Sequence, residues 1–164
     1  MALNHGGRDG SSPMRRAERP LRPRVRSSLF LLPAWFSPSS SMRAAFHRLR
    51  GVRLGRDVEI GYFVVFDNLY PEKIVVEDGA TITAHCAILA HDESAAYARD
   101  GEEIVRETRI KAKAFIGVHS VVMPGVVVGE RAIVGAGSVV TRSVPDGVTV
   151  AGVPARDISR KPTG

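Results

Sequence analysis

The sequence has little cysteine and no long apolar run, and each shortage excludes a class of protein. Among its 164 residues there is one cysteine, Cys86, which excludes an internal disulfide framework and any paired-cysteine zinc or redox motif. The apolar stretch at residues 29–36 is interrupted by Pro33 and is far shorter than the roughly 20 residues of a membrane-spanning helix. We therefore expect a single domain with no membrane span.

Positive charge is concentrated at one end of the chain. The formal net charge is +6, but residues 1–50 contain ten arginines against two acidic residues, whereas residues 51–164 contain 13 basic and 15 acidic residues. The body of the chain is thus weakly acidic, and we expect no nucleic-acid partner. Residues 1–38 are rich in Arg, Ser, Gly and Pro without an apolar period, which predicts a disordered basic tail.

A short amphipathic helix is predicted next, over residues 39–51. Four apolar residues recur at helical spacing: Met42, Ala45, Phe46 and Leu49. Three arginines fall elsewhere on the helix, and Gly51 is placed to end it. We expect the apolar face of this helix to cap one end of the fold that follows.

From residue 52 the chain follows a period of six residues. Large apolar side chains occupy the repeated position in three runs: Leu54, Ile60 and Phe66; Val76, Ile82 and Ile88; Ile110, Ile116, Val122, Val128, Val134 and Val140. Four residues after most of them stands a small or β-branched residue, and glycine often follows the large one directly. This period matches neither an α-helix nor the alternation of an ordinary sandwich.

Six residues suffice for a short strand and a tight corner, and three such units close a triangular coil. Stacked coils form a parallel β-helix whose centre holds the large apolar residues and whose corners hold the small ones. Cys86 occupies a small-residue position, so we expect it to pack in a corner. We expect the recurrent glycines to ease the backbone angles that corners require. The pattern predicts an all-β parallel β-helix over residues 52–155 and a C-terminal tail over residues 156–164.

Two stretches resemble a known family. The segment IGVHSVVMPGVVVGERAIVGAGSVVTRSVPDGVTVAGVPAR, from Ile116 to Arg156, closely resembles the last coils of hexapeptide-repeat acyltransferases. The segment FDNLYPEKIVVEDGATITAHCAILAHDES, from Phe66 to Ser94, resembles the middle coils of the same group, notably maltose and galactoside O-acetyltransferases and related sugar acyltransferases. The resemblance covers about residues 47–160, and the β-helix that it implies is left-handed.

The resemblance also implies a reaction and its participants. It implies acyl transfer from a coenzyme A thioester, most simply acetyl-CoA, to a hydroxyl of a sugar or glycan precursor. It implies no permanently bound cofactor, a small carbohydrate acceptor and a homotrimer. We also expect a cytoplasmic location, because Pro33 interrupts the only apolar run that could serve as the core of a signal peptide.

The catalytic residue implied by the resemblance is His91, which ends a coil just before an extruded loop over residues 92–107. Histidine suits this reaction because a base of near-neutral pKa must take the hydroxyl proton during attack, and no acyl-enzyme is needed when both substrates are held together. Asp92 or Glu93 could orient the imidazole, or both could be solvated loop charges. His119 is expected to line the site, and His85, where relatives often have asparagine, is a weaker candidate for acceptor binding.

The residues implied for the donor lie in the later coils. Val118 and Ala136 would contact coenzyme A through the main chain, and Thr141, Arg142 and Arg156 would lie toward its phosphate end. Ordinary surface charge is the alternative interpretation of the two arginines.

Two other functions remain open. His85, His91 and His119 could hold a metal in a lyase of the carbonic-anhydrase type, but their separations of six and 28 residues do not match the close pair that is usual there, so we expect no metal site. A β-helix scaffold without a donor site is the second alternative. Metal analysis and coenzyme A binding would distinguish these alternatives from the acyltransferase.

Overall fold

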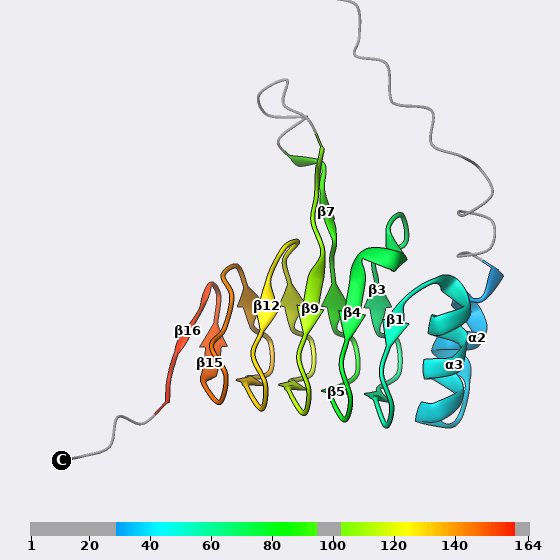
Figure 1. Cartoon of the computed structure of the whole chain (residues 1–164), viewed down its shortest axis with the longest axis horizontal. Coiled ribbons are helices and arrows are strands. Elements are labelled where there is room, and N and C mark those ends of the chain that lie inside the picture. The colour runs from blue at the N-terminus through cyan, green and yellow to red at the C-terminus, as the bar shows by residue number, and fades with distance from the viewer. Residues whose placement is uncertain (1–28, 95–102, 160–164) are drawn as a thin grey trace, which may run out of the picture.

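Residues 29–94 and 103–159 are described by the computed structural model, and most of them wind into a row of stacked coils (Figure 1). Two helices, α2 (Leu31–Phe36) and α3 (Ser40–Arg50), lie at the N-terminal end of this row. A 3-10 turn, Pro71–Lys73, leads into the second coil. No helix among the described residues is long and apolar enough to cross a membrane.

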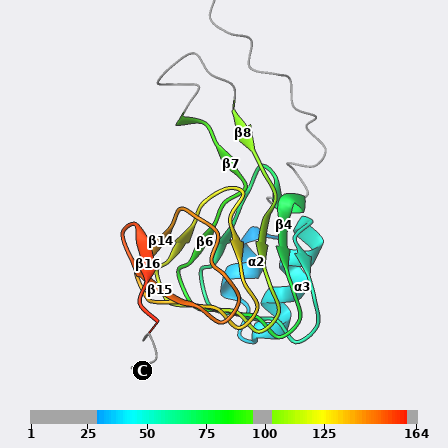
Figure 2. The same ribbon diagram turned by 60° about the vertical axis from the view of Figure 1, so that its left-hand side comes forward.

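Three parallel sheets form the sides of the coils (Figure 2). Sheet 1 contains β1 (Arg53–Leu54), β4 (Ile74–Val76), β9 (Thr108–Ile110) and β12 (Val127–Val128). Sheet 2 contains β2 (Glu59–Ile60), β5 (Thr81–Ile82), β10 (Phe115–Ile116), β13 (Ile133–Val134), β15 (Thr149–Gly152) and the antiparallel β16 (Ala155–Asp157). Sheet 3 contains β3 (Val65–Phe66), β6 (Ala87–Ile88), β11 (Val121–Val122) and β14 (Val139–Val140). Because the chain visits the three sheets in turn, the architecture is a parallel β-helix.

The large residues of the six-residue period form the core, as predicted. On sheet 3, for example, Phe66 aligns with Ile88, Ile88 with Val122 and Val122 with Val140, and all four are at most 1% exposed. The predicted corner residues are buried as well, among them Ala80, Cys86, Ala114, Ser120, Ala132 and Ser138. Each coil therefore adds one apolar layer to a continuous core.

The recurrent glycines serve close packing between coils, which corrects the expectation that they ease corner angles. A Cβ on Gly61 would lie 2.4 Å from the Ala84 nitrogen, and one on Gly117 would lie 2.6 Å from the Ala136 nitrogen. Neither glycine has positive φ. The left-handed conformation instead occurs two residues later, at Phe63, His119 and Gly137 for example, whose φ values are 56°, 61° and 69°.

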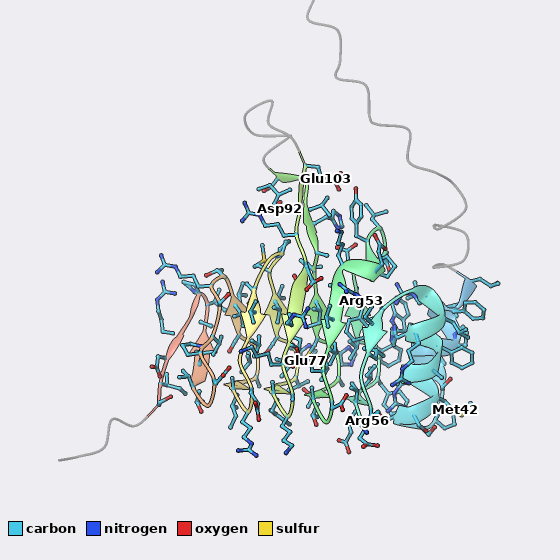
Figure 3. The ribbon with its side chains drawn as sticks, in the orientation of Figure 1. Met42, Arg53, Arg56, Glu77, Asp92 and Glu103 are labelled. Atoms are coloured by element: carbon cyan, nitrogen blue, oxygen red, sulfur yellow. The ribbon has the colours of Figure 1, made fainter. Side chains whose placement is uncertain are left out.

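Helix α3 caps the first coil with its basic face, the opposite of the face predicted. Ser39 caps its N-terminus through a 3.2 Å hydrogen bond from the Met42 nitrogen, and Gly51 ends it at φ 109°. Met42 and Leu49 are 46% and 43% exposed, and Met42 points outward in Figure 3. The buried residues are Arg43, Ala44, His47 and Arg50.

Hydrogen bonding explains why the basic face packs inward. Within the β-helix, the carbonyl of each large periodic residue accepts an N–H from the preceding coil, as Ile82 accepts from Gly61 and Ile88 from Asp67. The first coil has no preceding coil, so its equivalent carbonyls need other donors. The guanidinium groups of α3 supply one donor for each sheet: Arg48 to Leu54, Arg43 to Ile60 and Arg50 to Phe66.

Two predicted boundaries need correction. Residues 31–36, assigned to the disordered tail, form α2, where Ala34 is buried and the Trp35 indole N–H donates to the Val64 carbonyl at 2.9 Å. Residues 156–157, assigned to the C-terminal tail, belong to β16, which pairs with β15 because the chain turns back there. Residues 1–28 and 160–164 lie outside the described part, so the tails predicted there remain predictions.

The two ends of the predicted extruded loop form a two-stranded ribbon. Strands β7 (His91–Asp92) and β8 (Ile104–Val105) pair antiparallel and project beyond the coils in Figures 1 and 2. Residues 95–102, the centre of the predicted loop, lie outside the described part. The ribbon leaves the coils directly after β6, so His91 stands at its base.

Candidate active site

A buried carboxylate, Asp67, organises the corner at which the ribbon begins. Asp67 directly follows β3, and its own N–H donates to the Ile88 carbonyl of the next coil at 3.0 Å. Its Oδ1 accepts the N–H groups of Leu69 and Tyr70 at 2.9 and 3.0 Å, and its Oδ2 accepts those of Ala90 and His91 at 2.8 and 3.1 Å. The carboxylate thus joins the turn after the first coil to the end of the second.

The same oxygen, Asp67 Oδ2, accepts a hydrogen bond from His91 Nδ1 at 2.5 Å. The Asp67 side chain is fully buried, whereas the His91 side chain is 22% exposed. Since Nδ1 faces a carboxylate, it carries the proton of the neutral ring, and the lone pair lies on Nε2. The arrangement places an oriented imidazole base at the protein surface.

The charge of Asp67 is maintained by its hydrogen bonds. Burial by itself raises the pKa of this carboxyl, but the hydrogen bonds from His91 and from the backbone of Ala90, Tyr70 and Leu69 together outweigh burial and lower the pKa below its ordinary value. Asp67 is therefore ionised at neutral pH. An ionised partner at Nδ1 stabilises the imidazolium that forms when Nε2 takes a proton.

Tyr70 and the two strands of the ribbon lie next to His91. Tyr70 lies with its ring centroid 5.7 Å from that of His91, and its hydroxyl donates to Glu103 Oε2 at 3.2 Å. His91 pairs with Val105 across the ribbon, and the Arg106 N–H donates to the Ala90 carbonyl at 2.8 Å. Figure 3 shows Glu103 and Asp92 on this ribbon, above the coils. The backbone on both sides of His91 is therefore tied to neighbouring segments.

Asp92 does not make the contact expected for orienting the ring. Asp92 Oδ1 accepts the Ser94 N–H at 2.8 Å, and the Nδ1 position of His91 is occupied by Asp67. Hydrogen bonds to Ser94 lower the pKa of Asp92. Glu93 instead joins His91 and Glu103 in a group of potential ligand atoms within 4.8 Å of one another, which is the one such group of three among the described residues.

His85 and His119 lie on another corner, between sheets 2 and 3. Their rings stack on each other at 4.8 Å and 10°, and Phe63 stacks on His85 at 5.2 Å and 22°. Each stands between the second and third strand of its coil, whereas His91 follows the third strand. Stacking of adjacent coils thus brings His85 and His119 together, but the chain does not gather the three histidines that a metal lyase would need.

The predicted donor residues lie on the later coils. Val118 and Ala136 are exposed on the corner that carries His119, one coil apart, and the Gly137 N–H next to Ala136 donates to the Val118 carbonyl at 2.8 Å. Thr141 and Arg142 are exposed and follow β14, and Arg156 is exposed on β16. These residues accordingly occupy two corners and one sheet edge of a single chain.

Cys86 has no nucleophilic character in this structure. Its side chain is buried, and its thiol donates to the Gly117 carbonyl at 3.1 Å. Burial raises the pKa of the thiol above its ordinary value. Cys86 thus packs in a corner, as its place in the period predicts.

Sequence reasoning missed Asp67, although a signal for it exists. The six-residue period is interrupted twice, after Phe66 and after Ile88. Both residues lie on sheet 3 in adjacent coils, where they are aligned partners. The two interruptions must therefore emerge side by side, and the acidic residue that opens the first one faces the histidine in the second.

Comparison with known proteins gives concordant results. The family model described as bacterial transferase hexapeptide (six repeats) matches residues 107–142. The chain is 31% identical over 139 residues to a putative acetyltransferase, YvoF, of Bacillus subtilis, which covers 84% of this chain and 77% of that protein. It is 42% identical over 60 residues to the galactoside O-acetyltransferase of Escherichia coli, which covers 37% of this chain and only 30% of that enzyme.

A solved structure supports the fold. The hexapeptide-repeat acetyltransferase VCA0836 of Vibrio cholerae, complexed with acetyl coenzyme A, superposes with a TM-score of 0.63 at 21% identity, over 84% of this chain and 86% of that one. The repeat pattern, the strand topology and the extended similarity to YvoF agree. The chain belongs to the hexapeptide-repeat acetyltransferase family.

Proposed function

We propose that this chain is an acetyl-CoA-dependent O-acetyltransferase on a left-handed parallel β-helix, and that its acceptor is a hydroxyl of a sugar or glycan precursor. The observation that carries the proposal is the Asp67–His91 pair. A buried carboxylate at Nδ1 and a partly exposed ring supply the general base that hydroxyl acetylation needs. Similarity to a galactoside O-acetyltransferase supports the acceptor class.

His91 Nε2 takes the hydroxyl proton while the acceptor oxygen forms a bond to the thioester carbonyl carbon. The resulting tetrahedral oxyanion collapses by breaking the C–S bond. The coenzyme A thiolate leaves and recovers the proton from the imidazolium of His91. Asp67 stabilises that imidazolium through Nδ1, and no acyl-enzyme forms.

The donor is assigned to the later coils. Val118 and Ala136 are exposed at a corner where small side chains let a ligand approach the main chain, and Thr141, Arg142 and Arg156 offer a hydroxyl and two cations for phosphate groups. A relative of the same fold binds acetyl coenzyme A, which supports this donor. Since acetyl-CoA is a cytoplasmic metabolite, we place the reaction in the cytoplasm.

A homotrimer would complete the site. His91 and Val118 lie on different corners of one chain, so a neighbouring chain must bring a donor corner to each His91. The outward side of sheet 3 offers a flat aliphatic face for such packing, formed by Val65, Ala87, Val121 and Val139 in register. Light scattering should give three times 17.7 kDa, about 53 kDa, and a stable, active monomer would contradict the assembly.

The proposed function is tested by thiol release from acetyl-CoA in the presence of a panel of sugars and nucleotide sugars. We expect release that depends on one acceptor class and that is lost in His91→Ala. Binding of coenzyme A without any acceptor-dependent release would contradict the enzyme, and absence of coenzyme A binding would favour a scaffold. Stoichiometric metal in the active protein would favour the lyase.

A further inference from the structure

Arg50 differs from the other two arginines that cap the first coil. Arg48 is exposed, and Arg43 reaches sheet 2 and the Ser37 carbonyl. Arg50 is only 4% exposed and reaches sheet 3, the sheet from which Asp67 emerges. Its contacts therefore bear on the candidate active site as well as on the cap.

The Arg50 guanidinium holds the residues on both sides of Asp67. Nη2 donates to the Phe66 carbonyl at 3.3 Å and to Asn68 Oδ1 at 2.6 Å. Asp67 lies between these two attachment points, and its carboxylate makes the hydrogen bond to His91 Nδ1. A change in the backbone over residues 66–68 would thus be transmitted directly to the direction of that carboxylate.

The guanidinium is itself held in place by His47. Arg50 Nη1 lies 2.9 Å from His47 Nδ1, and the His47 ring packs edge-on against Phe66 at 4.7 Å. Burial, followed by the charges of Arg50 and Arg43, lowers the pKa of His47 to about 3. His47 is therefore neutral, and its Nδ1 accepts from Arg50.

Arg50 remains a cation despite its burial. Burial lowers its pKa to about 10, and the opposing attraction of Asp67 limits that fall. The group is thus charged at neutral pH, beside an ionised Asp67. The attraction between these opposite charges favours the packing of α3 against the turn that contains Asp67.

We propose that Arg50 is a positioning residue for the transfer reaction: from the cap helix it fixes the backbone of residues 66–68 and thereby aims Asp67 at His91 Nδ1. This inference rests on the proposed function of His91 as the base. It assigns to helix α3 an indirect part in catalysis, through Asp67, in addition to its structural part.

The test compares Arg50→Gln with Arg43→Gln, because both residues are buried on α3 and both cap a first-coil carbonyl, but only Arg50 flanks Asp67. We expect Arg50→Gln to lower kcat by roughly 10- to 100-fold with little change in KM for acetyl-CoA, the usual effect of a small misplacement of a catalytic group. Arg43→Gln should lower the melting temperature. Its kcat, measured well below that temperature, should stay within about threefold of wild type, a change too small for the loss of a catalytic interaction.

A spectroscopic readout separates positioning from general destabilisation. The Nδ1–H proton of His91, held by a buried carboxylate, should give a low-field proton resonance, assigned by its absence from His91→Ala. We expect this resonance to weaken or broaden in Arg50→Gln and to persist in Arg43→Gln. If a folded Arg50→Gln variant had the kcat and the low-field resonance of the wild type, the inference would be overturned.

Two milder variants keep the inference testable if Arg50→Gln does not fold. Arg50→Lys retains a cation but has one terminal nitrogen in place of the two that contact His47, Phe66 and Asn68. Its kcat should therefore lie between those of wild type and Arg50→Gln. Asn68→Ala removes one attachment point and should lower kcat by a few fold. Wild-type kcat in both variants would overturn the inference. An inactive wild type that still loses the resonance in Arg50→Gln would refute the proposed function but not the positioning.

Discussion

Replacement of Asp67 by asparagine is the sharpest perturbation that this site allows. The carboxylate accepts two N–H groups at Oδ1 and three at Oδ2, the latter including His91 Nδ1. An asparagine has one carbonyl oxygen and one NH₂ group, so its NH₂ must face at least two N–H donors in either orientation. The substitution changes the hydrogen-bonding capacity of the side chain with almost no change in volume.

Two magnitudes follow from this geometry. Losing two or three charge-assisted hydrogen bonds, at about 1.5 to 3 kcal/mol each, should lower the free energy of unfolding by roughly 3 to 9 kcal/mol unless the turn relaxes. Loss of the ionised partner of His91 should lower kcat by roughly 10²–10⁴-fold, or about 3 to 5 kcal/mol of transition-state stabilisation. Urea denaturation measures the first effect, and continuous thiol release from acetyl-CoA measures the second.

Asp92→Asn is the matched control, because it removes a carboxylate charge from the residue next to His91. Asp92 contacts Ser94 and not the imidazole, so kcat should remain within about twofold of wild type, the effect of a residue that makes no contact with the reacting groups. If Asp67→Asn retained near-normal kcat while Asp92→Asn lost it, the orienting group would be Asp92 and the reasoning from the buried carboxylate would be wrong.

Three further predictions concern other parts of the chain. His91→Ala should lower kcat by roughly 10²–10⁴-fold with little effect on coenzyme A binding, whereas His119→Ala should cost much less; the reverse result in thiol release would show that the wrong histidine has been chosen. The pKa of His47 is lowered to about 3, so the folded state favours the neutral ring, and the free energy of unfolding should fall by at most about 5 kcal/mol as pH drops from about 6.5 to 3. The free energy of unfolding of His47→Gln should depend less on pH over this range, and the same pH dependence as wild type would contradict this. Deleting residues 1–38 should lower the melting temperature because it removes α2, whereas deleting residues 1–28 should not; equal melting temperatures for the two truncations would refute a stabilising role for α2.

The core and the coil architecture could be predicted from the sequence because both depend on a local pattern. Every sixth residue faces inward wherever a short strand is followed by a tight corner. The spacing of Ile82, Ile116 and Val134 therefore predicts that they align on adjacent strands of one parallel sheet, as they do. The same holds for the corner position of Cys86, which is buried as its place in the period predicts. The choice of His91 also came from the sequence, through the resemblance to the acyltransferase family, and its role as the base stays a prediction.

The basic face of α3 could not be predicted from helical periodicity. An amphipathic pattern normally directs Met42 and Leu49 inward, but they are exposed, and Arg43 and Arg50 are buried. The reason is the open end of the β-helix, where first-coil carbonyls lack the N–H donors that a preceding coil would supply. Satisfying buried carbonyls outweighs burying two apolar side chains, and that demand exists only after the coils have formed.

The sequence by itself determined the repeating unit, the core residues and the histidine at the loop. Only the tertiary structure decided which group orients that histidine, because Asp67 lies 24 positions earlier in the chain. Stacking of one coil on the next places the turn after Phe66 beside the base of the ribbon, and the buried oxygen of Asp67 then collects three N–H donors from Ala90 and His91. The spacing of residues along the chain is enough to predict which side chains enter the core. The contact between Asp67 and His91 joins two insertions in the repeat, and it forms only because the lengths of the coils bring these insertions side by side.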